Sequence, residues 1–507
     1  MAEPVLVLFL LLVLVPLAGA VLVRFAPARV ADALAALTAA LDAAIAVLLV
    51  ARHGLAGVSV PLGGLTALDR AMGHPVLLGG FRLDGLGSLV LLGNALIGVA
   101  CVLYSAAYVG PRNRELPASD DRRSFYFWLL LFIGAMAGLV TSQTLLQLFL
   151  FWEITTLCSW ALIGFYQEEH GALAAAYKAF LITAGGGLAL FAAIIVLLAV
   201  TGSVGFDAIA GLGAGGRVAL ASLLLVLLLA GAWAKSGQVP FHTWLPDAMV
   251  APSPVSAYLH AASMVNAGAF LVLRVVTAAP AGGTAAAGAV PGPIVVLIGG
   301  MGVLTLAVAV AQFFYQSDLK RLLALSTIAG LAYVFIGAAL GAAGSVRAAQ
   351  GASLHILAHG AGKALLFLSV GSLSYACGTR RIADLRGVLR KVPVPAIGFL
   401  IGALTVTGVP PFAGFWSKFA LIGGAVQLGG VGLWVGVLLL AESVVAFAWF
   451  LWVGHKVFLG APSPAVMAAS PTSRVMDLAL VLLMILCLVV PIFGLPLAAA
   501  VGLGPGS

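Results

Sequence analysis

Ionisable side chains stand inside long apolar runs of this sequence, where a charge carries a large free-energy cost. They are Asp42, Glu153, Lys178, Lys235, His260, His355, His359, Lys363, Lys418 and Glu442. On insertion scales, a charge at the centre of a lipid bilayer costs about 2.5–3.5 kcal/mol, so it needs a buried partner or a water-filled cavity. Because these side chains can bind and release protons, the set indicates an ion path.

Residues 231–270 combine a lysine, an interrupted helix and a histidine in GAWAKSGQVPFHTWLPDAMVAPSPVSAYLHAASMVNAGAF. Lys235 stands in an apolar run that Pro240 and a polar turn end, and a new helix is predicted after Pro252 and Pro254. That second helix carries His260. Interrupted helices at membrane depth are tolerated only where the loose backbone is enclosed by protein or lines a cavity. We therefore expect this stretch to line the path.

Glu153 places one carboxylate among large apolar side chains in LFLFWEITTLCSW, with Thr155, Thr156 and Ser159 as its polar neighbours in sequence. Burial favours the neutral form of such a group, whereas a nearby Lys235 favours the charged form. A pair of this kind could act as a switch, because opening it weakens the hold of the lysine on its proton and closing it strengthens that hold. A plain structural ion pair is the alternative.

Residues 353–367, SLHILAHGAGKALLF, repeat ionisable side chains every four residues, at His355, His359 and Lys363. This spacing places all three on one face of a helix. Two histidines four residues apart could bind zinc, but no third ligand is evident nearby, so we predict no metal site. Histidine titrates near neutral pH, which favours proton relay. A structural polar seam is the alternative.

The segment TVTGVPPFAGFWSKFAL interrupts a helix at Pro410 and Pro411 and places Lys418 two turns later. Here the break precedes the lysine, whereas the lysine precedes the break around Lys235. This reversal, five helices apart, predicts two inverted repeats. Glu442, in LLLAESVVAFAWF, is a candidate partner of Lys418, with a structural role as the alternative.

Two further buried charges have less specific surroundings. Asp42 lies near the middle of an apolar helix, away from the other charges in sequence, and a structural hydrogen bond is the favoured account. Lys178 lies one or two turns into its helix. It could extend to the membrane surface or take part in transport.

Composition excludes an ordinary soluble protein. Hydrophobic residues make up 63% of the 507 residues and charged residues 8%, with a mean hydropathy of +1.17; soluble domains are about 25% charged. The net charge of +8 could suggest nucleic-acid binding, but the basic residues are scattered through predicted loops. The excess of basic residues in cytoplasmic loops explains them better, so we expect no nucleic-acid partner.

Apolar stretches long enough to cross a bilayer core of about 30 Å recur along the whole chain. We place them at 4–24, 30–51, 84–109, 126–142, 143–166, 172–200, 218–236, 255–276, 291–314, 321–341, 350–376, 396–421, 431–455 and 475–500. Helices four and five are separated only by Thr141, Ser142 and Gln143. The pattern predicts an all-α polytopic membrane protein of about fourteen transmembrane helices, with broken helices 7/8 and 12.

These helices are predicted to form one integral-membrane domain, residues 1–507. It comprises N-terminal helices 1–3 (1–124), a first repeat of helices 4–8 (125–276), a second, inverted repeat of helices 9–13 (291–459) and a C-terminal helix (475–507). Gly- and Ala-rich patches at 53–64, 202–216 and 277–293 are predicted to be short connectors.

More than half of the 25 lysines and arginines fall in loops that follow odd-numbered helices, among them Lys320, Arg321, Arg380 and Arg381. Cytoplasmic loops carry an excess of basic residues. This bias places those loops in the cytoplasm and both termini outside, in a multi-pass protein of the cell inner (cytoplasmic) membrane. An even number of helices agrees with that orientation.

The sequence shows no motif for a soluble catalytic domain or a bound cofactor. It has no phosphate-binding glycine loop followed by Lys and Ser or Thr, and no cysteine cluster for an iron–sulfur centre. Ser, His and Asp occur together in PFHTWLPDAMVAPS without a nucleophile elbow, and the proline-flanked turn explains them. We therefore expect no catalytic residues and no cofactor. Whether the whole assembly is an enzyme stays open, and any redox chemistry would lie in partner subunits.

Five segments resemble the antiporter-like family. Its members are the proton-pumping membrane subunits of respiratory complex I (NADH–quinone oxidoreductase), their relatives in membrane-bound hydrogenases, and the large subunits of multisubunit sodium/proton antiporters. The segments are LFLFWEITTLCSWALIGFY, AKSGQVPFHTWLPDAMVAPSPVSAYLHAASMVNAG, SDLKRLLALSTIAGLAYVFIGAALG, HILAHGAGKALLFLSVG and GVPPFAGFWSKFAL. They span about residues 125–425, and the second is highly specific. The resemblance implies the fourteen-helix core of the family.

The resemblance also implies roles at matched positions. Glu153 and Lys235 correspond to the glutamate–lysine pair of the family, and His260 lies on the broken eighth helix. Lys363 and Lys418 fall where the central and exit lysines are expected. A lysine rather than a glutamate at the exit position is similar to the sodium/proton antiporter subunits and to the distal subunit of complex I.

The segment YKAFLITAGGGLALF, which contains Lys178, is similar to the large antiporter subunit in particular. Two departures concern the end of the sequence, which stops after helix fourteen. The long lateral helix of the distal subunit of complex I is absent, and so is the large C-terminal extension of the antiporter subunit. A hydrogenase-type, a complex I-like and a compact antiporter assembly therefore stay open.

We accordingly expect a proton-translocating membrane subunit of a larger complex, in contact with the lipid bilayer and with other membrane subunits. Protons would be taken up near Glu153 and Lys235, pass along a hydrated row of Lys235, His260, His359 and Lys363 to Lys418, and leave on the opposite side. The predicted translocation residues are Glu153, Lys178, Lys235, His260, His355, His359, Lys363, Lys418 and Glu442. Whether sodium also moves is left open.

Two other functions fit the same sequence. A stand-alone secondary cation/proton antiporter would be active as this chain alone. A structural scaffold subunit would transport nothing, and in it Glu153→Gln and Lys418→Ala would be silent.

Overall fold

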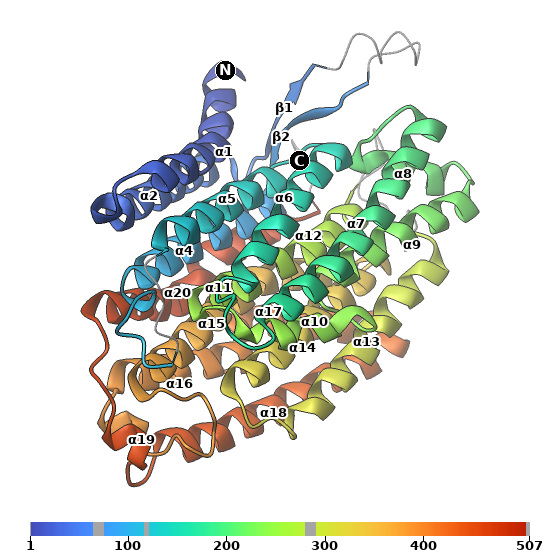
Figure 1. The fold of residues 1–507 in the computed structure, drawn as a ribbon. Coiled ribbons are helices and arrows are strands. Elements are labelled where there is room, and N and C mark those ends of the chain that lie inside the picture. Colours follow the sequence, from blue (N-terminus) through green and yellow to red (C-terminus); the bar gives the residue numbers. More distant parts are fainter. Residues whose placement is uncertain (1, 64–75, 116–120, 279–289, 503–507) are drawn as a thin grey trace.

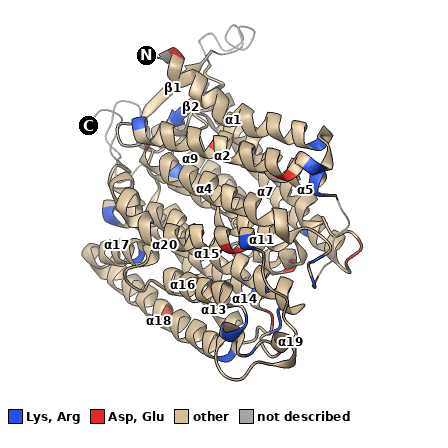
Figure 2. Ribbon diagram, turned by 90° about the vertical axis from the view of Figure 1, so that its left-hand side faces the viewer, with Lys and Arg blue, Asp and Glu red and all other residues tan. Residues whose placement is uncertain are grey.

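Long apolar helices form one bundle, as the computed structural model describes over residues 2–63, 76–115, 121–278 and 290–502 (Figure 1). Within these ranges, thirteen helices are long and apolar enough to cross a membrane. Figure 2 shows that most of the helical ribbon carries no charged residue. The predicted all-helical polytopic membrane fold is confirmed.

The N-terminal part contains three long helices and a β-hairpin. Its elements are α1 (Ala2–Phe25), α2 (Ala28–His53), β1 (Val58–Leu62), β2 (Gly79–Leu83) and α4 (Gly85–Tyr108). The strands pair antiparallel, with Val58 opposite Leu83. The prediction of a plain connector at 53–64 was wrong, because two strands of only five residues, one with Pro61 and one with Gly79, give a weak strand pattern.

The middle part covers the residues of the predicted first repeat. Its elements are α5 (Arg122–Val140), α6 (Leu145–Ile163), α7 (Ala172–Thr201), α8 (Phe206–Ala214), α9 (Val218–Lys235), η1 (Phe241–Thr243), α10 (Trp244–Asp247), η2 (Ala248–Val250), α11 (Ser253–Ala261) and α12 (Met264–Val276). Helices α5 and α6 are separate, as predicted, and the side chain of Thr144 starts α6 by accepting a hydrogen bond from the Gln147 amide. The patch at 202–216, expected to be a connector, contains α8.

The last part covers the residues of the predicted second repeat and of the predicted C-terminal helix. Its elements are α13 (Gly292–Phe313), α14 (Leu319–Ala342), α15 (Val346–Cys377), η3 (Val388–Arg390), α16 (Pro393–Thr407), α17 (Ala413–Leu428), α18 (Gly430–Phe458), α19 (Pro464–Met467) and α20 (Arg474–Ala499). The predicted connector at 277–293 lies largely outside the described residues. The inverted relation between the two repeats stays a prediction.

Both predicted interruptions occur. Lys235 ends α9, and the chain reaches α11 only through the short helices η1, α10 and η2. The twelfth predicted helix is divided into α16 and α17, where Gly408 ends α16 in the left-handed region (φ 87°) and Pro410 and Pro411 follow. Neither half counts as a full span, so the fourteen predicted segments yield thirteen spanning helices within the described ranges. The eighth segment is also divided, after Ala261.

Helix α15 occupies the centre of the bundle. It is 32 residues long, and its most apolar window is fully buried, whereas no more than 33% of the corresponding windows of α1, α13 and α18 is buried. Helices α14, α16 and α17 pack against α15, and so does α11. The ionisable face of α15 is therefore enclosed by the two interrupted segments.

We name the two ends of the bundle by what they carry. The basic end holds residues 378–392 and α19, and the hairpin end holds β1 and β2 (Figure 1). Helix α14 starts at the basic end, where the Asp318 side chain accepts a hydrogen bond from the Arg321 amide at 3.1 Å.

Candidate proton path

Lys235 is the first candidate along the path, at the buried C-terminus of α9. Its side chain is 0% exposed. Its Nζ donates to the Trp152 carbonyl oxygen at 2.6 Å and to Thr156 Oγ1 at 2.7 Å, and it lies 4.6 Å from the Trp152 ring centroid. The ammonium group is thus held by α6 through one carbonyl, one hydroxyl and an aromatic face.

Glu153 lies on the same turn of α6, beside the groups that hold Lys235. The two side chains act on each other electrostatically. Within the described residues, however, no ion pair of 4.0 Å or less joins them, and Glu153 Oε1 is buried without a hydrogen-bond partner. The predicted pair is therefore adjacent and open in this structure.

The predicted polar neighbours of Glu153 bond elsewhere. Thr155 and Thr156 donate to the Trp152 carbonyl, and Ser159 donates to the Thr156 carbonyl. Hydroxyl groups inside a helix commonly bond the carbonyl one turn back. The hydroxyl groups that the sequence suggested as partners of Glu153 therefore bond the helix backbone and Lys235.

Helix α7 approaches the Glu153 carboxylate through Gly187, which gives a selective way to displace it. A Cβ at Gly187 would lie 2.2 Å from Glu153 Oε1, whereas a Cβ at Gly185 would meet nothing within 4 Å. Because the clash is with the flexible end of a side chain, Gly187→Ala should move the carboxylate at little cost in stability. We expect a several-fold slower proton transport in reconstituted vesicles, with Gly185→Ala as the matched control. Equal rates for the two variants would contradict a role for the position of Glu153.

His260 lies on α11 in the middle of the bundle. It is 0% exposed and stacks on Phe367 of α15, with ring centroids 4.8 Å apart. Among the described residues, neither of its ring nitrogens has a hydrogen-bond partner. Lys363 acts on it electrostatically. The imidazole therefore faces α15 with both nitrogens free to accept or donate a proton.

The three ionisable residues of α15 descend one face, as predicted. His355 and His359 have ring centroids 5.7 Å apart. Lys363 Nζ donates to the Leu323 carbonyl at 3.1 Å and to the Ser326 hydroxyl. A lysine is again held by one carbonyl and one hydroxyl of a neighbouring helix, here α14.

Lys418, on α17, forms a buried ion pair with Glu442 of α18. Nζ lies 3.5 Å from Glu442 Oε2 and 3.0 Å from Ser443 Oγ. Both side chains are less than a tenth exposed. Ser417, the preceding residue, bonds His355 Nδ1 at 2.9 Å, so the pair is joined to the α15 face. The predicted partnership of Glu442 with Lys418 is confirmed.

Tyr333 of α14 connects these groups, and no pattern in the sequence pointed to it. Its hydroxyl donates to Glu442 Oε2 and lies 2.6 Å from the Leu439 carbonyl. Its ring lies 4.4 Å from Lys418 Nζ and stacks against His355. One tyrosine in the apolar run AGLAYVF has no polar neighbour that would reveal this role.

Gln238 is a second residue that sequence reasoning missed, in the turn after α9. It is 1% exposed, and its amide nitrogen donates to the Ser236 carbonyl at 3.1 Å and to the Ile328 carbonyl of α14 at 3.3 Å. Ile328 lies two residues beyond Ser326, which contacts Lys363. Gln238 thus bridges the region of Lys235 and the region of Lys363, between which the described residues show no direct hydrogen bond or ion pair.

Lys178 lies apart from this row, at the basic end. It pairs with Asp247 at 2.7 Å, and both side chains are about two-fifths exposed (40% and 38%). The pair lines a pocket of about 320 Å³, together with Arg321 and Arg380. Lys178 therefore extends toward the surface and is positioned at an opening.

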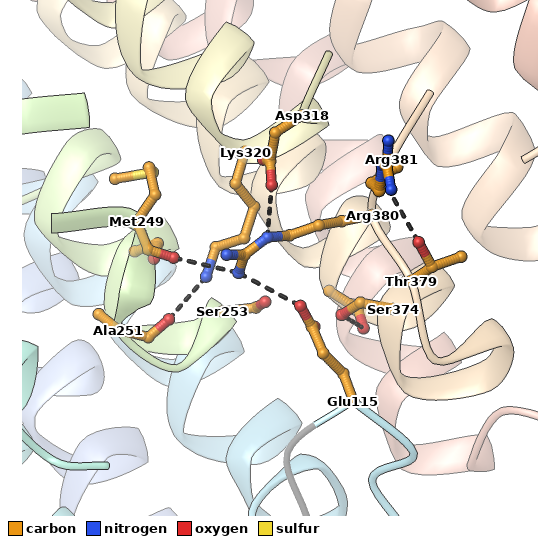
Figure 3. A network of polar contacts seen from close by, with 12 residues as sticks. Glu115, Met249, Ala251, Ser253, Asp318, Lys320, Ser374, Thr379, Arg380 and Arg381 are labelled. Atoms are coloured by element: carbon orange, nitrogen blue, oxygen red, sulfur yellow. Dashed lines mark hydrogen bonds and ion pairs between the residues drawn. The ribbon is translucent and has the colours of Figure 1, made fainter. Parts of the chain in front are cut away.

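A charged network closes the same end of the bundle (Figure 3). Arg380 pairs with Asp318 at 2.6 Å and with Glu115 at 3.2 Å, and donates to the Met249 carbonyl at 3.3 Å. Burial opposes the charge of Arg380, but Asp318 and then Glu115 outweigh it and raise the pKa of Arg380 above its ordinary value. The network ties the start of α14, the loop after α4 and η2 together.

Arg380→Ala should lower the thermal stability of the protein, because it leaves two largely buried carboxylates without their common partner. Charge-assisted hydrogen bonds of this type contribute roughly 1.5–3 kcal/mol each. Arg381 is the matched control, since its side chain is 71% exposed and its contact with Asp384 is 3.9 Å long. The thermal-unfolding midpoint in detergent should fall for Arg380→Ala and stay near the wild-type value for Arg381→Ala. A similar midpoint for both variants would contradict this expectation.

Lys320 lies beside the network. The sequence predicted it in a loop, but the structure places it in a helix. Helix α14 begins at Leu319 and turns Lys320 inward, leaving it 1% exposed. Its Nζ donates to the Ala251 carbonyl at 2.6 Å. The prediction failed because the start of the helix was placed after Lys320.

Asp42 also differs from expectation. It is 0% exposed on α2, yet within the described residues neither carboxylate oxygen has the predicted hydrogen-bond partner. No group of three His, Cys, Asp or Glu side chains that could hold a metal ion occurs in the part of the chain that the structure describes.

Comparison with known proteins gives the family of this fold. The family model described as NADH:quinone oxidoreductase/Mrp antiporter, TM, matches residues 142–445. That range contains Glu153, Lys235, Lys363 and Glu442, and so most of the row.

Three curated relatives illustrate the match. An Na(+)/H(+) antiporter subunit of Staphylococcus saprophyticus is 33% identical over 429 residues, which is 80% of this chain and 51% of the relative. An Na(+)/H(+) antiporter subunit of Alkalihalophilus pseudofirmus is 36% identical over 403 residues, covering 75% of this chain and 48% of the relative. Chloroplast NAD(P)H-quinone oxidoreductase subunit 5 of Lemna minor is 35% identical over 355 residues, covering 66% and 41%. The chain spans about half the length of the curated relatives it matches.

Two solved structures share the fold. A chain of the Mrp complex from Dietzia sp. DQ12-45-1b aligns over 97% of this chain and 51% of its own length, with a TM-score of 0.82 and 28% identity. A chain of the archaeal membrane-bound sulfane sulfur reductase, a respiratory membrane complex, aligns over 95% and 75%, with a TM-score of 0.80 and 21% identity. The second likeness concerns the fold alone. The chain therefore belongs to the family of transmembrane subunits common to NADH:quinone oxidoreductases and Mrp antiporters.

Proposed function

We propose that this chain is a proton-translocating membrane subunit of a multisubunit complex. The observation that carries the proposal is the buried row that runs from His260 along the α15 face to the pair of Lys418 and Glu442. Titratable side chains at membrane depth mark proton relays in pumps and transporters. A row of this length would be costly to keep for structure alone, because each buried charge must be compensated.

The geometry suggests how the row could move protons. Lys235 and Lys363 each rest on one carbonyl and one hydroxyl, which hold the ammonium form without a contacting carboxylate. Closing the Glu153–Lys235 pair would favour the charged lysine, and opening it would favour release of the proton. A proton released by Lys235 would pass by way of the Gln238 region to Lys363 and His359, and reach Lys418 through His355. Release would follow from the Lys418–Glu442 pair.

The direction of the path follows from charge. The basic end carries Arg321, Arg380, Arg381 and further loop cations, and the excess of basic residues in cytoplasmic loops supports a cytoplasmic location for this end and an outside location for both termini. The pocket lined by Lys178 and Asp247 opens at this end and provides a place for proton uptake. Exit would lie toward the hairpin end, beyond Lys418.

The complex itself is inferred from the relatives. Those named above are subunits of Na(+)/H(+) antiporters and of an NAD(P)H-quinone oxidoreductase. We infer that this chain works beside other membrane subunits in an antiporter-type or respiratory assembly, with any redox chemistry in its partners. Sodium could be the counter-ion in an antiporter assembly.

Transport by the purified complex, in vesicles with a pH-sensitive dye inside, tests the proposal against its alternatives. The proposal predicts proton movement by the complex and none by this chain alone. A stand-alone antiporter predicts the same transport from the chain alone. A scaffold subunit predicts that Glu153→Gln and Lys418→Ala leave transport by the complex unchanged.

A further inference from the structure

Lys320 is a buried cation that the proposed row does not use. It is 1% exposed, and the hydrogen bond of its Nζ to the Ala251 carbonyl lies just before the start of α11. Figure 3 shows Lys320 beside Arg380, with its amino group directed at Ala251 and Ser253 close by. Asp318, Glu115 and Arg380 all act on it electrostatically. Lys320 thus stands between the charged network of the basic end and α11.

A line of polar side chains leads from this position into the bundle. Ser253, Ser256 and His260 are spaced at i, i+3 and i+7 on α11, so they share one helix face. All three are 0% exposed. Side chains three or four residues apart on a helix have Cβ atoms about 5–6 Å apart, a separation that a bridging water can span.

The inner end of this line is occupied by a group without a partner. Neither His260 Nδ1 nor Nε2 has a hydrogen-bond partner among the described residues. Lys320 acts on His260 electrostatically, as Lys363 does. At the outer end of the line, beside Lys320, protons can arrive from water through Glu115 and Asp318, whose side chains are 15% and 19% exposed.

We propose that Lys320 is a proton-transfer residue of a second uptake branch, which joins the row at His260 without passing through Glu153 or Lys235. The charge switch of the Glu153–Lys235 pair still drives onward transfer of protons from both branches, so coupled transport needs Lys235 whichever branch supplies the proton. The inference rests on the proposed function. The Lys320 ammonium releases one proton to the hydroxyl line of Ser253 and Ser256, and a free ring nitrogen of His260 binds a proton at the other end. The neutral amine of Lys320 then takes a proton from water through Glu115 or Asp318. The net change is one proton moved from the basic end to His260.

A purely structural role for Lys320 is the competing explanation, and arginine separates the two. Arginine keeps the positive charge and can donate to the Ala251 carbonyl, but it does not release a proton in proteins. Lys320→Arg should therefore lower the transport rate of the reconstituted complex by at least about threefold. Lys456→Arg is the matched control, because Lys456 is an exposed lysine of α18 that covers Trp452 and takes no part in the row or the uptake pocket. Transport by Lys320→Arg at the wild-type rate would overturn the proposal.

Ser256→Ala provides a second variant in case the longer arginine prevents assembly. The Ser256 hydroxyl donates a long hydrogen bond of 3.4 Å to the Pro252 carbonyl, which the substitution removes. The Pro252 carbonyl still accepts a hydrogen bond from the Ser256 amide, so it does not lose its last partner. Ser105→Ala on α4 removes an equally buried hydroxyl away from the line. Slower transport by Ser256→Ala than by Ser105→Ala supports the branch, and equal rates overturn it.

The failure of this inference and the failure of the proposed function give different results. If Lys320→Arg and Ser256→Ala transport normally while Lys235→Ala does not, the branch is wrong and the row stands. If all three transport normally, the proposed function is wrong as well.

Discussion

Lys235→Ala should abolish coupled proton transport by the complex and leave its assembly intact. Lys235 is buried at the end of α9, where it is held by α6 beside Glu153, and it carries the proton at the first step of the proposed path. Its removal leaves no buried carbonyl without a hydrogen bond, because the Trp152 carbonyl still accepts hydrogen bonds from the hydroxyls of Thr155 and Thr156. The transport rate should fall at least about tenfold, which corresponds to about 1.4 kcal/mol in activation free energy.

Two controls separate the loss of the amino group from a packing defect. Lys235→Met keeps most of the side-chain volume and should lose transport to the same extent. Lys456→Ala removes an exposed lysine of α18 that covers Trp452, and should transport normally. Assembly is checked by co-purification of the partner subunits. Wild-type transport by Lys235→Ala would remove this lysine from the mechanism.

Much of the fold follows from the sequence, because apolar stretches of spanning length are a strong signal in a chain with few charges. The divided twelfth segment was also predictable, since Pro410 and Pro411 cannot continue a helix. A broken eighth helix was implied by the family resemblance, but the position of the break after Ala261 could not be predicted, because Ala262 and Ser263 are compatible with a helix. The break there depends on tertiary packing.

The site was predictable where spacing on one helix decides the geometry. His355, His359 and Lys363 share a face because they recur every four residues, and this held. Lys418 and Glu442 lie on neighbouring helices, and their pairing also held, because two opposite charges at membrane depth strongly favour contact.

Contacts that depend on the exact rotation of helices were beyond the sequence. Lys235 bonds the Trp152 carbonyl and Thr156, whereas the sequence pointed only to Glu153 as its partner. Tyr333 reaches Glu442 from an apolar run that carries no polar pattern. In each case a carbonyl or hydroxyl that sequence cannot place decides the partner.

Lys363→Ala should interrupt the path at its centre. Lys363 is 0% exposed and acts electrostatically on His260 and His359, and both Lys418 and Glu442 act on it in turn. In the proposed path we therefore expect protons from either uptake route to pass through Lys363 before they reach the Lys418–Glu442 pair. The Leu323 carbonyl keeps hydrogen bonds from Ser326 and Thr327, so the variant should still fold.

The initial rate of internal pH change in vesicles containing the Lys363→Ala complex tests the central claim most directly. We expect a rate at least about tenfold below wild type, with wild-type rates for Lys456→Ala and unchanged subunit composition. A Lys363→Ala complex that moves protons as fast as the wild type would show that the buried row does not carry them.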